Sequence, residues 1–288
     1  MTIHHLNCGS VRQIEATYDG PPPTHAVNHC LLVETDGHGL VLVDTGLGLG
    51  DVRDPHATLG ADWVALSQPV LAEEETAVRQ VARLGFATED VRHILLTHLD
   101  VDHCGGLPDF PDAQVHVLAA ELDAAVAEAP SYRYRPAHWA HHPRWVPYPV
   151  DDGEDWFGFT SLPVRGLPPE FRLVPLGGHT AGHTGVAVHG DGRWLLHCGD
   201  AYYYHRELDT HPEAHPLLDI VQARSEVHRD LRLGTQARLR ELVRDHRDEV
   251  TVISAHDPWE FERRRGASTG ERSAAAARSA SPGIAPRD

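Results

Sequence analysis

The residues best suited to chemistry lie in one short segment, His98-Leu99-Asp100-Val101-Asp102-His103-Cys104-Gly105-Gly106, directly after an apolar run. Imidazole and carboxylate groups are common ligands of divalent metals, and four of them fall within six positions, at 98, 100, 102 and 103. In an extended segment, residues 98, 100 and 102 project from one face, and His103 faces a neighbouring point. The two glycines allow a tight backbone turn behind them. The segment therefore predicts a metal site at the end of a strand.

Three further clusters of ligand-type residues follow, and each ends or follows an apolar stretch. They are Gly177-Gly178-His179-Thr180-Ala181-Gly182-His183, His197-Cys198-Gly199-Asp200 and Ile253-Ser254-Ala255-His256-Asp257. Upstream, the apolar run Val41-Leu42-Val43 leads into Asp44-Thr45-Gly46. A charged surface loop would not explain this recurrence at the ends of apolar stretches, so the pattern favours a metal site.

Taken in order, these clusters resemble the metallo-β-lactamase superfamily, whose members carry HxHxDH, then a distant His, a bridging Asp and a last His. The resemblance covers residues 3 to 260. It implies an α/β fold, the four-layer αββα sandwich, in which two mixed sheets face each other and helices cover the outside. We therefore expect one catalytic domain over residues 1–262, with a dinuclear metal site at one edge of the sheets.

The resemblance also implies a role for each ligand-type residue. One metal ion would be held by His98 and His179, the second by Asp102, His103 and His256, and Asp200 would bridge the two. The expected cofactors are thus two divalent metal ions, with Zn²⁺ the first choice.

Asp100 departs from the family pattern, because most members have His at this position. A carboxylate there either binds the first metal, which suits Zn²⁺ and also Fe or Mn, or orients a ligand without binding the metal itself. We include Asp100 among the metal ligands. Flavodiiron oxygen reductases carry Glu at the same position and use two irons, so an iron redox enzyme is an alternative. Only 32 residues follow His256, too few for the flavin domain of those proteins.

Two metal ions sharing Asp200 would supply hydroxide from water near neutral pH and polarise a carbonyl group, without a protein nucleophile. The segment Asp200-Ala201-Tyr202-Tyr203 resembles the DAxY motif of N-acyl homoserine lactonases, whose tyrosine helps to bind the lactone carbonyl. Tyr203 occupies that position, and packing in the core is its alternative role. The resemblance thus implies a metallo-hydrolase that opens a lactone or cleaves a small ester, with Asp102 and Tyr203 as the catalytic residues and a small molecule as substrate. A metal-binding protein without catalysis is a further alternative.

The composition narrows the choice of partners. The net charge is −17, and all 25 basic residues are Arg. Such acidity disfavours nucleic acid, so a phosphodiesterase or nuclease of the superfamily would require a local patch of arginines. The chain shows neither a signal-peptide pattern nor an apolar run long enough to span a membrane. We expect a cytoplasmic enzyme without a membrane partner; the composition indicates no particular oligomeric state.

The four cysteines show no CxxC pair or disulfide spacing, so we expect reduced thiols. Cys104 and Cys198 adjoin proposed ligands, where a small packed residue is favoured over a nucleophile or an extra ligand. Asp44 is expected to form structural hydrogen bonds, and His183 to orient a neighbouring residue.

The proposed ligands follow segments with recognisable periodicity. Strands are predicted at 27–34, 40–43, 114–118, 171–176, 185–189, 194–197 and 251–254, and helices at 73–84, 119–129 and broadly over 217–243.

Residues 130–171 interrupt this pattern with eight of the 21 prolines and three of the six tryptophans. We interpret the segment as an insertion that is either a lid over the site or a surface excursion. Its His138, His141 and His142 are expected to be surface or lid residues. Residues 263–288, rich in Ala, Ser, Gly and Arg, are predicted to be a disordered tail.

Overall fold

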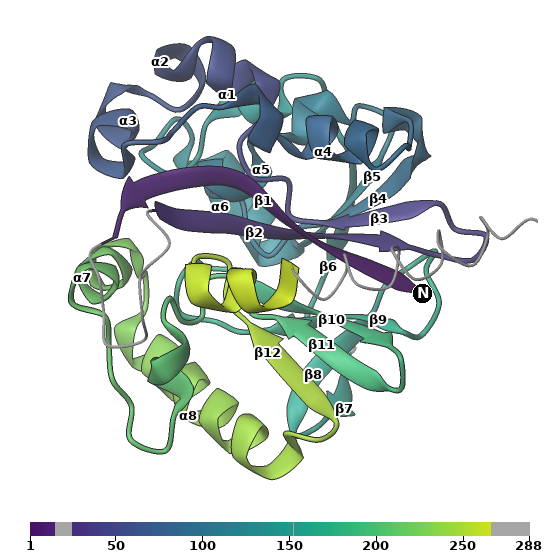
Figure 1. Ribbon diagram of the computed structural model, residues 1–288, viewed down its shortest axis with the longest axis vertical. Helices are drawn as coiled ribbons and strands as arrows, with labels where there is room; N and C mark the ends of the chain where they lie inside the picture. The colour runs from purple at the N-terminus through teal and green to yellow at the C-terminus, as the bar shows by residue number, and fades with distance from the viewer. Residues whose placement is uncertain (15–24, 152, 266–288) are drawn as a thin grey trace, which may run out of the picture.

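Two mixed β-sheets form the centre of the structure, a computed structural model that describes residues 1–14, 25–151 and 153–265. Within these residues each sheet has six strands (Figure 1). The first has the order β1-β2-β3-β4-β5-β6: Thr2–Gln13, His25–Glu34, Leu40–Val43, Val91–Leu95, Gln114–Leu118 and Arg144–Tyr148. The second has the order β12-β11-β10-β9-β8-β7: Val250–Ile253, Arg193–His197, Thr184–Gly190, Phe171–Pro175, Phe159–Pro163 and Glu154–Trp156.

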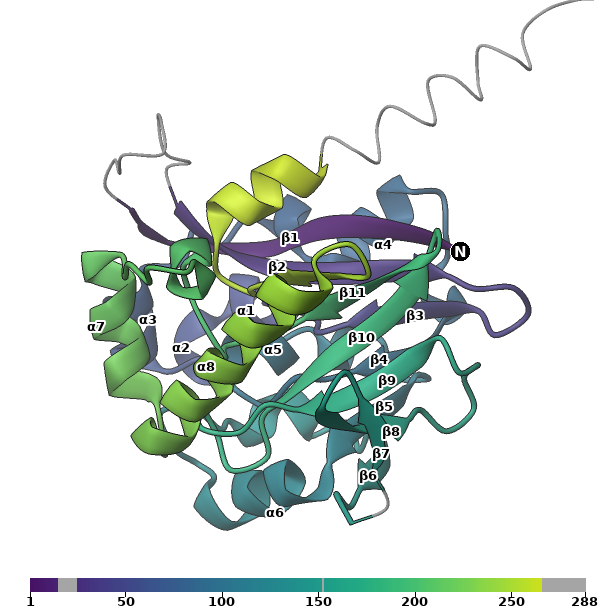
Figure 2. The same cartoon turned by 90° about the horizontal axis from the view of Figure 1, so that it is seen from below.

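Helices cover the outer faces of both sheets (Figures 1 and 2). The first half of the chain contributes α1 to α6, at Leu49–Arg53, Pro55–Thr58, Ala61–Ser67, Ala77–Arg83, Val101–Cys104 and Ala119–Glu128. The second half contributes α7 (Pro216–Ser225), α8 (Arg229–His246) and a last helix over residues 258–265. Single-turn 3₁₀ helices lie at Glu73–Glu75, Thr88–Asp90, Leu107–Asp109, Pro136–Trp139 and His205–Leu208.

The alternation of side chains along the strands builds three apolar layers. On β2, Leu31 and Val33 point into the layer between the sheets, and Leu32 points into the layer beneath the outer helices. Such strands are buried on both faces, which explains their nearly continuous apolar sequence. The third layer packs the second sheet against Leu239 and Leu242 of α8. The predicted αββα sandwich is confirmed.

The strand directions bring the ends of several strands to one edge. Strands β3, β4 and β5 are parallel neighbours, so Asp44, His98 and Glu121, which follow them, lie at the same edge. In the second sheet β11 is parallel to β12, which places Asp200 and His256 side by side. The topology thus explains why residues far apart in sequence can form one site.

Residues 130–171 differ from the predicted insertion, because much of the segment belongs to the sheets. β6 extends the first sheet, and β7 and β8 extend the second. The prolines obscured this pattern; Pro147 is tolerated because β6 is an edge strand, with a partner on one side only. Only the beginning of the segment, with Tyr132 and Arg133, reaches the cavity described below.

Four other segments depart from the predictions. The long strand β1 and the helices α1 to α3 were not predicted, and the broad helical region after residue 216 is divided into α7 and α8. The last helix continues to residue 265, three residues into the predicted tail, where Arg265 Nε lies 2.8 Å from Glu262 Oε2. The rest of that tail, 266–288, lies outside the described residues.

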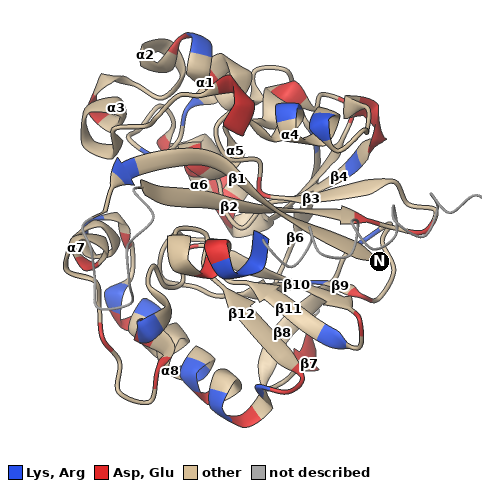
Figure 3. Ribbon diagram, in the orientation of Figure 1, with Lys and Arg blue, Asp and Glu red and all other residues tan. Residues whose placement is uncertain are grey.

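Arginines gather along α8 (Figure 3), but acidic side chains lie close to several of them. Glu226 pairs with both Arg229 and Arg232, and Arg244 pairs with Asp245. The helix therefore presents mixed charge. No helix within the described ranges combines the length and the apolar character required to cross a membrane.

Candidate metal centre

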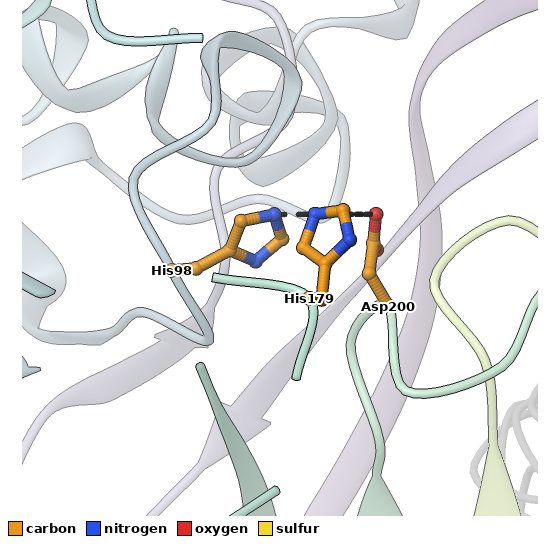
Figure 4. Close-up of side chains that lie close together, drawn as sticks. All are labelled: His98, His179 and Asp200. Atoms are coloured by element: carbon orange, nitrogen blue, oxygen red, sulfur yellow. Dashed lines mark ion pairs between the residues drawn. The ribbon is translucent and has the colours of Figure 1, made fainter. Parts of the chain in front are cut away.

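The first ligand group consists of His98, His179 and Asp200, whose donor atoms all lie within 4.8 Å of one another (Figure 4). His179 Nε2 is 3.4 Å and His98 Nε2 is 4.0 Å from Asp200 Oδ2. All three side chains are buried. The residues come from the ends of β4, β9 and β11, so this group joins the two sheets.

The second ligand group consists of Asp102, His103 and His256, again with donor atoms within 4.8 Å of one another. His103 Nε2 lies 3.3 Å from His256 Nε2, and Asp102 Oδ2 lies 3.8 Å from His256 Nε2. The sequence predicted an extended segment here, but residues 102 and 103 lie in α5. Adjacent side chains on a helix point about 100° apart, and here both reach the second ligand group.

Asp200 lies between the two groups. Its Oδ2 faces His98 and His179, whereas its Oδ1 is 3.2 Å from both His103 Nε2 and His256 Nε2. Burial disfavours the ionised carboxylate, but the neighbouring histidines outweigh burial and hold the pKa of Asp200 well below its usual value. This is the geometry expected of a bridging carboxylate.

Asp100 lies beside the first ligand group. Its Oδ2 is 3.2 Å from His179 Nε2 and 3.6 Å from His98 Nε2. Its Oδ1 is 3.2 Å from Nη1 of Arg133, a residue that the sequence analysis did not identify. Burial opposes ionisation of Asp100, but the charge of Arg133 and of the histidines lowers its pKa well below the usual value.

The buried polar atoms test whether this arrangement fits a metal. His98 Nε2 and Asp200 Oδ1 are buried and lack a hydrogen-bond partner among the described residues. Buried polar atoms without partners are costly, and here they point to a common centre. Imidazole nitrogens together with carboxylate oxygens are the donor set that Zn²⁺, Fe and Mn accept. The residues fit two divalent ions.

Hydrogen bonds from behind orient the histidines. His103 Nδ1 donates to Asp44 Oδ2 at 2.9 Å, and His256 Nδ1 donates to the carbonyl of Val27 at 2.9 Å. His98 Nδ1 lies 2.9 Å from Thr97 Oγ1, which in turn donates to Asp44 at 2.7 Å. Each contact occupies Nδ1 and leaves Nε2 facing the site.

Two structural roles predicted from the sequence agree with this geometry. Burial opposes ionisation of Asp44, but the hydrogen bond with His103 and the charges of the neighbouring histidines together outweigh burial and lower the pKa of Asp44. His183 Nε2 accepts a hydrogen bond from the backbone N–H of Asp200 at 2.9 Å, and its Nδ1 donates to the carbonyl of Leu176 at 2.7 Å. Asp44 and His183 therefore support the ligands from outside the groups.

Glu121, also missed by the sequence analysis, links two ligand loops. Its Oε1 accepts from the backbone N–H of Leu99 at 3.0 Å and from Tyr134 Oη at 3.1 Å. Its Oε2 accepts from Thr180 Oγ1 at 2.6 Å and from the backbone N–H of Gly182 at 3.0 Å. Only its position near the start of α6, after a strand, could have suggested this role.

Cys104 and Cys198 are buried free thiols, and burial raises the pKa of both well above the usual value. Neither belongs to a ligand group in the described structure, which agrees with the prediction of small packed residues. His138 differs from its predicted surface or lid role: it is buried, and its Nε2 lies 2.8 Å from Asp51 Oδ1. This hydrogen bond gives both buried side chains a polar partner.

The glycines after Cys104 serve close packing rather than a left-handed turn. A Cβ atom at Gly105 would lie 2.2 Å from Asp51 Oδ2 and 2.8 Å from the carbonyl oxygen of Val101. Its φ of −58° is ordinary for any residue. Residue 105 can therefore lie this close to Asp51 and Val101 only because it has no side chain.

A cavity of 440 Å³ opens onto the site. Its walls are mostly apolar and come from β1, α3 and α7, with Trp63 and Leu218 among them, and α3 and α7 lie at the same end of the molecule (Figures 1 and 2). Asp100, Asp102 and Asp200 also line the cavity. The ligand groups are thus reachable by a small molecule.

Tyr203 lines this cavity, whereas Tyr202 lies in the core behind the second sheet. The hydroxyl of Tyr203 donates to Asp200 Oδ2 at 2.6 Å and lies 3.3 Å from Ser225 Oγ. Burial, followed by the charge of Asp200, raises the pKa of Tyr203 well above its usual value. Tyr203 therefore keeps its proton and remains a hydrogen-bond donor at the site.

Comparison with known proteins agrees with this architecture. The family described as the metallo-beta-lactamase superfamily matches residues 24–250. A Mycobacterium tuberculosis protein named "Probable metallo-hydrolase" is 43% identical over 261 residues, which covers 89% of this chain and 80% of that protein. An N-acyl homoserine lactonase of Bacillus cereus is 33% identical over 96 residues, covering only 33% of this chain and 38% of the lactonase.

A solved structure of an N-acyl homoserine lactone hydrolase, with N-hexanoyl-L-homoserine bound at its catalytic metal centre, shares the fold. Its TM-score is 0.66 at 19% identity, and the match covers 90% of this chain and 94% of that chain. The family match extends over most of the chain and includes the segments that carry five of the six residues in the two ligand groups. The chain belongs to the metallo-beta-lactamase superfamily.

Proposed function

We propose that this protein is a metal-dependent hydrolase that opens a lactone or cleaves a small carboxylic ester. The observation that carries the proposal is the position of Asp200 in the wall of a cavity, with one oxygen facing His98 and His179 and the other facing the second ligand group. Support also comes from the N-acyl homoserine lactonases that resemble part of the chain.

When bound, two divalent ions would lower the pKa of water to about 7 and polarise the acyl carbonyl. In the reaction, the water oxygen bonds to the acyl carbon, the bond from that carbon to the alkoxy oxygen breaks, and the leaving oxygen takes a proton. Asp102, the partly exposed carboxylate of the second group, lines the cavity. Its carboxylate would take the proton from water and pass it to the leaving oxygen.

Tyr203 would act on the other side of the carbonyl. Its protonated hydroxyl now donates to Asp200 Oδ2, and a substrate carbonyl entering the cavity would offer a second acceptor. A donor that strengthens its bond as negative charge develops stabilises the transition state. The apolar walls suit the hydrocarbon part of the substrate.

The test pairs metal content with turnover. Protein purified without added metal is analysed by plasma mass spectrometry, and hydrolysis of acyl homoserine lactones, γ-lactones and simple esters is followed with a pH indicator. We expect two metal equivalents and hydrolysis of at least one of these classes. Bound iron without any hydrolysis would contradict the proposal and direct attention to oxidative chemistry, for which the oxygen donor Asp100 is suitable.

A further inference from the structure

Arg133 contacts the carboxylate that distinguishes this site. Its Nη1 lies 3.2 Å from Asp100 Oδ1, and its Nη2 donates to the backbone carbonyl of Ser225 at the end of α7. The other oxygen, Asp100 Oδ2, faces His179 Nε2 and His98 Nε2. The carboxylate is therefore held with one oxygen on the arginine and the other on the first ligand group.

The position of Arg133 is fixed by its loop. The backbone N–H of Ser131 donates to the carbonyl of Tyr134 at 2.9 Å, and the Tyr134 hydroxyl donates to Glu121 Oε1 at 3.1 Å. The Arg133 side chain is only 15% exposed. Because Glu121 also binds the loops that carry His98 and His179, one buried carboxylate positions both the arginine and the ligands.

Charge explains why an arginine is needed at this point. Asp100, Asp102 and Asp200 all line the base of the cavity, and a buried carboxylate that loses its partner is strongly destabilised. Arg12 and Arg224 line the same cavity, but within the described residues neither has an ion pair with Asp100. Arg133 thus differs from Arg12 and Arg224 by its direct contact with Asp100.

We propose that Arg133 is a positioning residue for the first ligand group. By binding Asp100 Oδ1, it orients Oδ2 so that Asp100 completes the metal ligand set with His98 and His179. The inference rests on the metal centre of the proposed function and adds to it the residue that allows a carboxylate to serve at position 100.

The test is a Zn²⁺ titration of metal-free protein in competition with a chromophoric chelator. Wild type should bind two equivalents tightly. Arg133→Gln should weaken one equivalent about 10- to 100-fold and leave the other unchanged, as expected for a group that supports a ligand. Arg224→Gln is the matched control: it removes the same charge from the same cavity and should titrate like wild type.

Two further variants identify the route of the effect. In an Asp100→Asn background, Arg133→Gln should cause no additional loss, because residues that act through each other are not additive. Arg133→Lys, which keeps the charge but not the planar guanidinium, should restore part of the affinity. If Arg133→Gln does not fold, Arg133→Lys takes its place in the titration. Zn²⁺ affinity of Arg133→Lys equal to that of wild type would then overturn the inference.

The outcomes separate the two proposals. If wild type binds no Zn²⁺, both the metal centre and the role of Arg133 are wrong. If wild type binds two equivalents and Arg133→Gln binds them equally tightly, only the positioning role is overturned. Equal weakening in Arg133→Gln and Arg224→Gln would also overturn it, because the effect would then reflect the charge of the cavity as a whole.

Discussion

The two ligand groups are supported in different ways. In the second group, His103 donates directly to the carboxylate of Asp44, and His256 donates to a backbone carbonyl. In the first group, His98 reaches Asp44 only through the hydroxyl of Thr97, and Nδ1 of His179 has no hydrogen-bond partner among the described residues. The first group instead has the pair of Asp100 and Arg133 beside it. The scaffold therefore holds both histidines of the second group directly, whereas the first group has an indirect link through Thr97 and the neighbouring pair of Asp100 and Arg133.

The largest effect is expected where the groups meet. Asp200→Ala removes the carboxylate that faces both groups, so we expect the protein to retain neither equivalent and activity to fall below detection. Metal analysis and the lactone assay measure this directly. Retention of one tightly bound equivalent would show that one group binds metal without the bridge.

Removal of the Tyr203 hydroxyl should slow turnover while both ligand groups still hold metal. We expect Tyr203→Phe to lower kcat about 100-fold, the scale of losing one hydrogen-bond donor to the transition state, with two metal equivalents retained. Tyr202→Phe is the matched control, because its hydroxyl contacts Glu260 instead of Asp200. Wild-type kinetics in Tyr203→Phe on every accepted substrate would exclude the predicted contact.

Two isosteric changes test the difference between the groups. Asp44→Asn places an N–H₂ or a weaker acceptor against His103 Nδ1, and should weaken the equivalent of the second group about 10- to 100-fold. Because Asp44 also accepts from Thr97, the equivalent of the first group should weaken to a smaller extent. Asn tolerates the left-handed φ of 55° at this position. Thr97→Val removes the support of His98 and should weaken the equivalent of the first group, by less than Asp44→Asn weakens that of the second.

Spectra of Co²⁺-substituted protein distinguish which group each change disturbs. Asp51→Asn serves as the control, since Asp51 is a buried carboxylate paired with His138 and belongs to neither group. Identical spectral changes in the Asp44 and Thr97 variants would contradict a separate support for each group.

The smallest expected effect is a dependence of stability on pH through Glu260, which contacts the end of the strand before His256. Glu260 accepts from the backbone N–H of Ser254 at 2.7 Å, and burial, together with the charge of Asp257, raises its pKa to about 8. The pKa of Glu260 is higher in the folded than in the unfolded protein. Its contribution to the free energy of unfolding is therefore complete below the ordinary pKa of 4.5 and is lost as the pH rises toward 8.

The free energy of unfolding should therefore fall by about 1 to 3 kcal/mol between pH 6 and 8, and Glu260→Gln should reduce that slope. Urea denaturation at several pH values measures both. An unchanged slope in Glu260→Gln would assign the pH dependence to another group.

The seven predicted ligand positions were assigned from short local patterns that follow apolar stretches, and from the resemblance of their order to the metallo-β-lactamase superfamily. The structure brings these side chains together in two adjoining groups linked by Asp200, with Asp100 beside the first. Arg133 and Glu121 had no such pattern. Each supports the site through one side chain from a segment distant from the ligands, so only three-dimensional packing brings it there. Likewise β6, β7 and β8 have proline-rich sequences that hide their pairing in the sheets.

The ligand groups join the two halves of the sandwich, since His98 and Asp102 follow the first sheet whereas His179, Asp200 and His256 follow strands of the second. Bound metal ions would link residues that follow strands of the two different sheets. Their affinity would add to the free energy of folding by mass action, about 2.7 kcal/mol when free metal is 100 times the dissociation constant. The amount of intact enzyme in a cell would then follow the supply of the metal, and starvation for it would remove the protein by unfolding and proteolysis as well as by loss of catalysis.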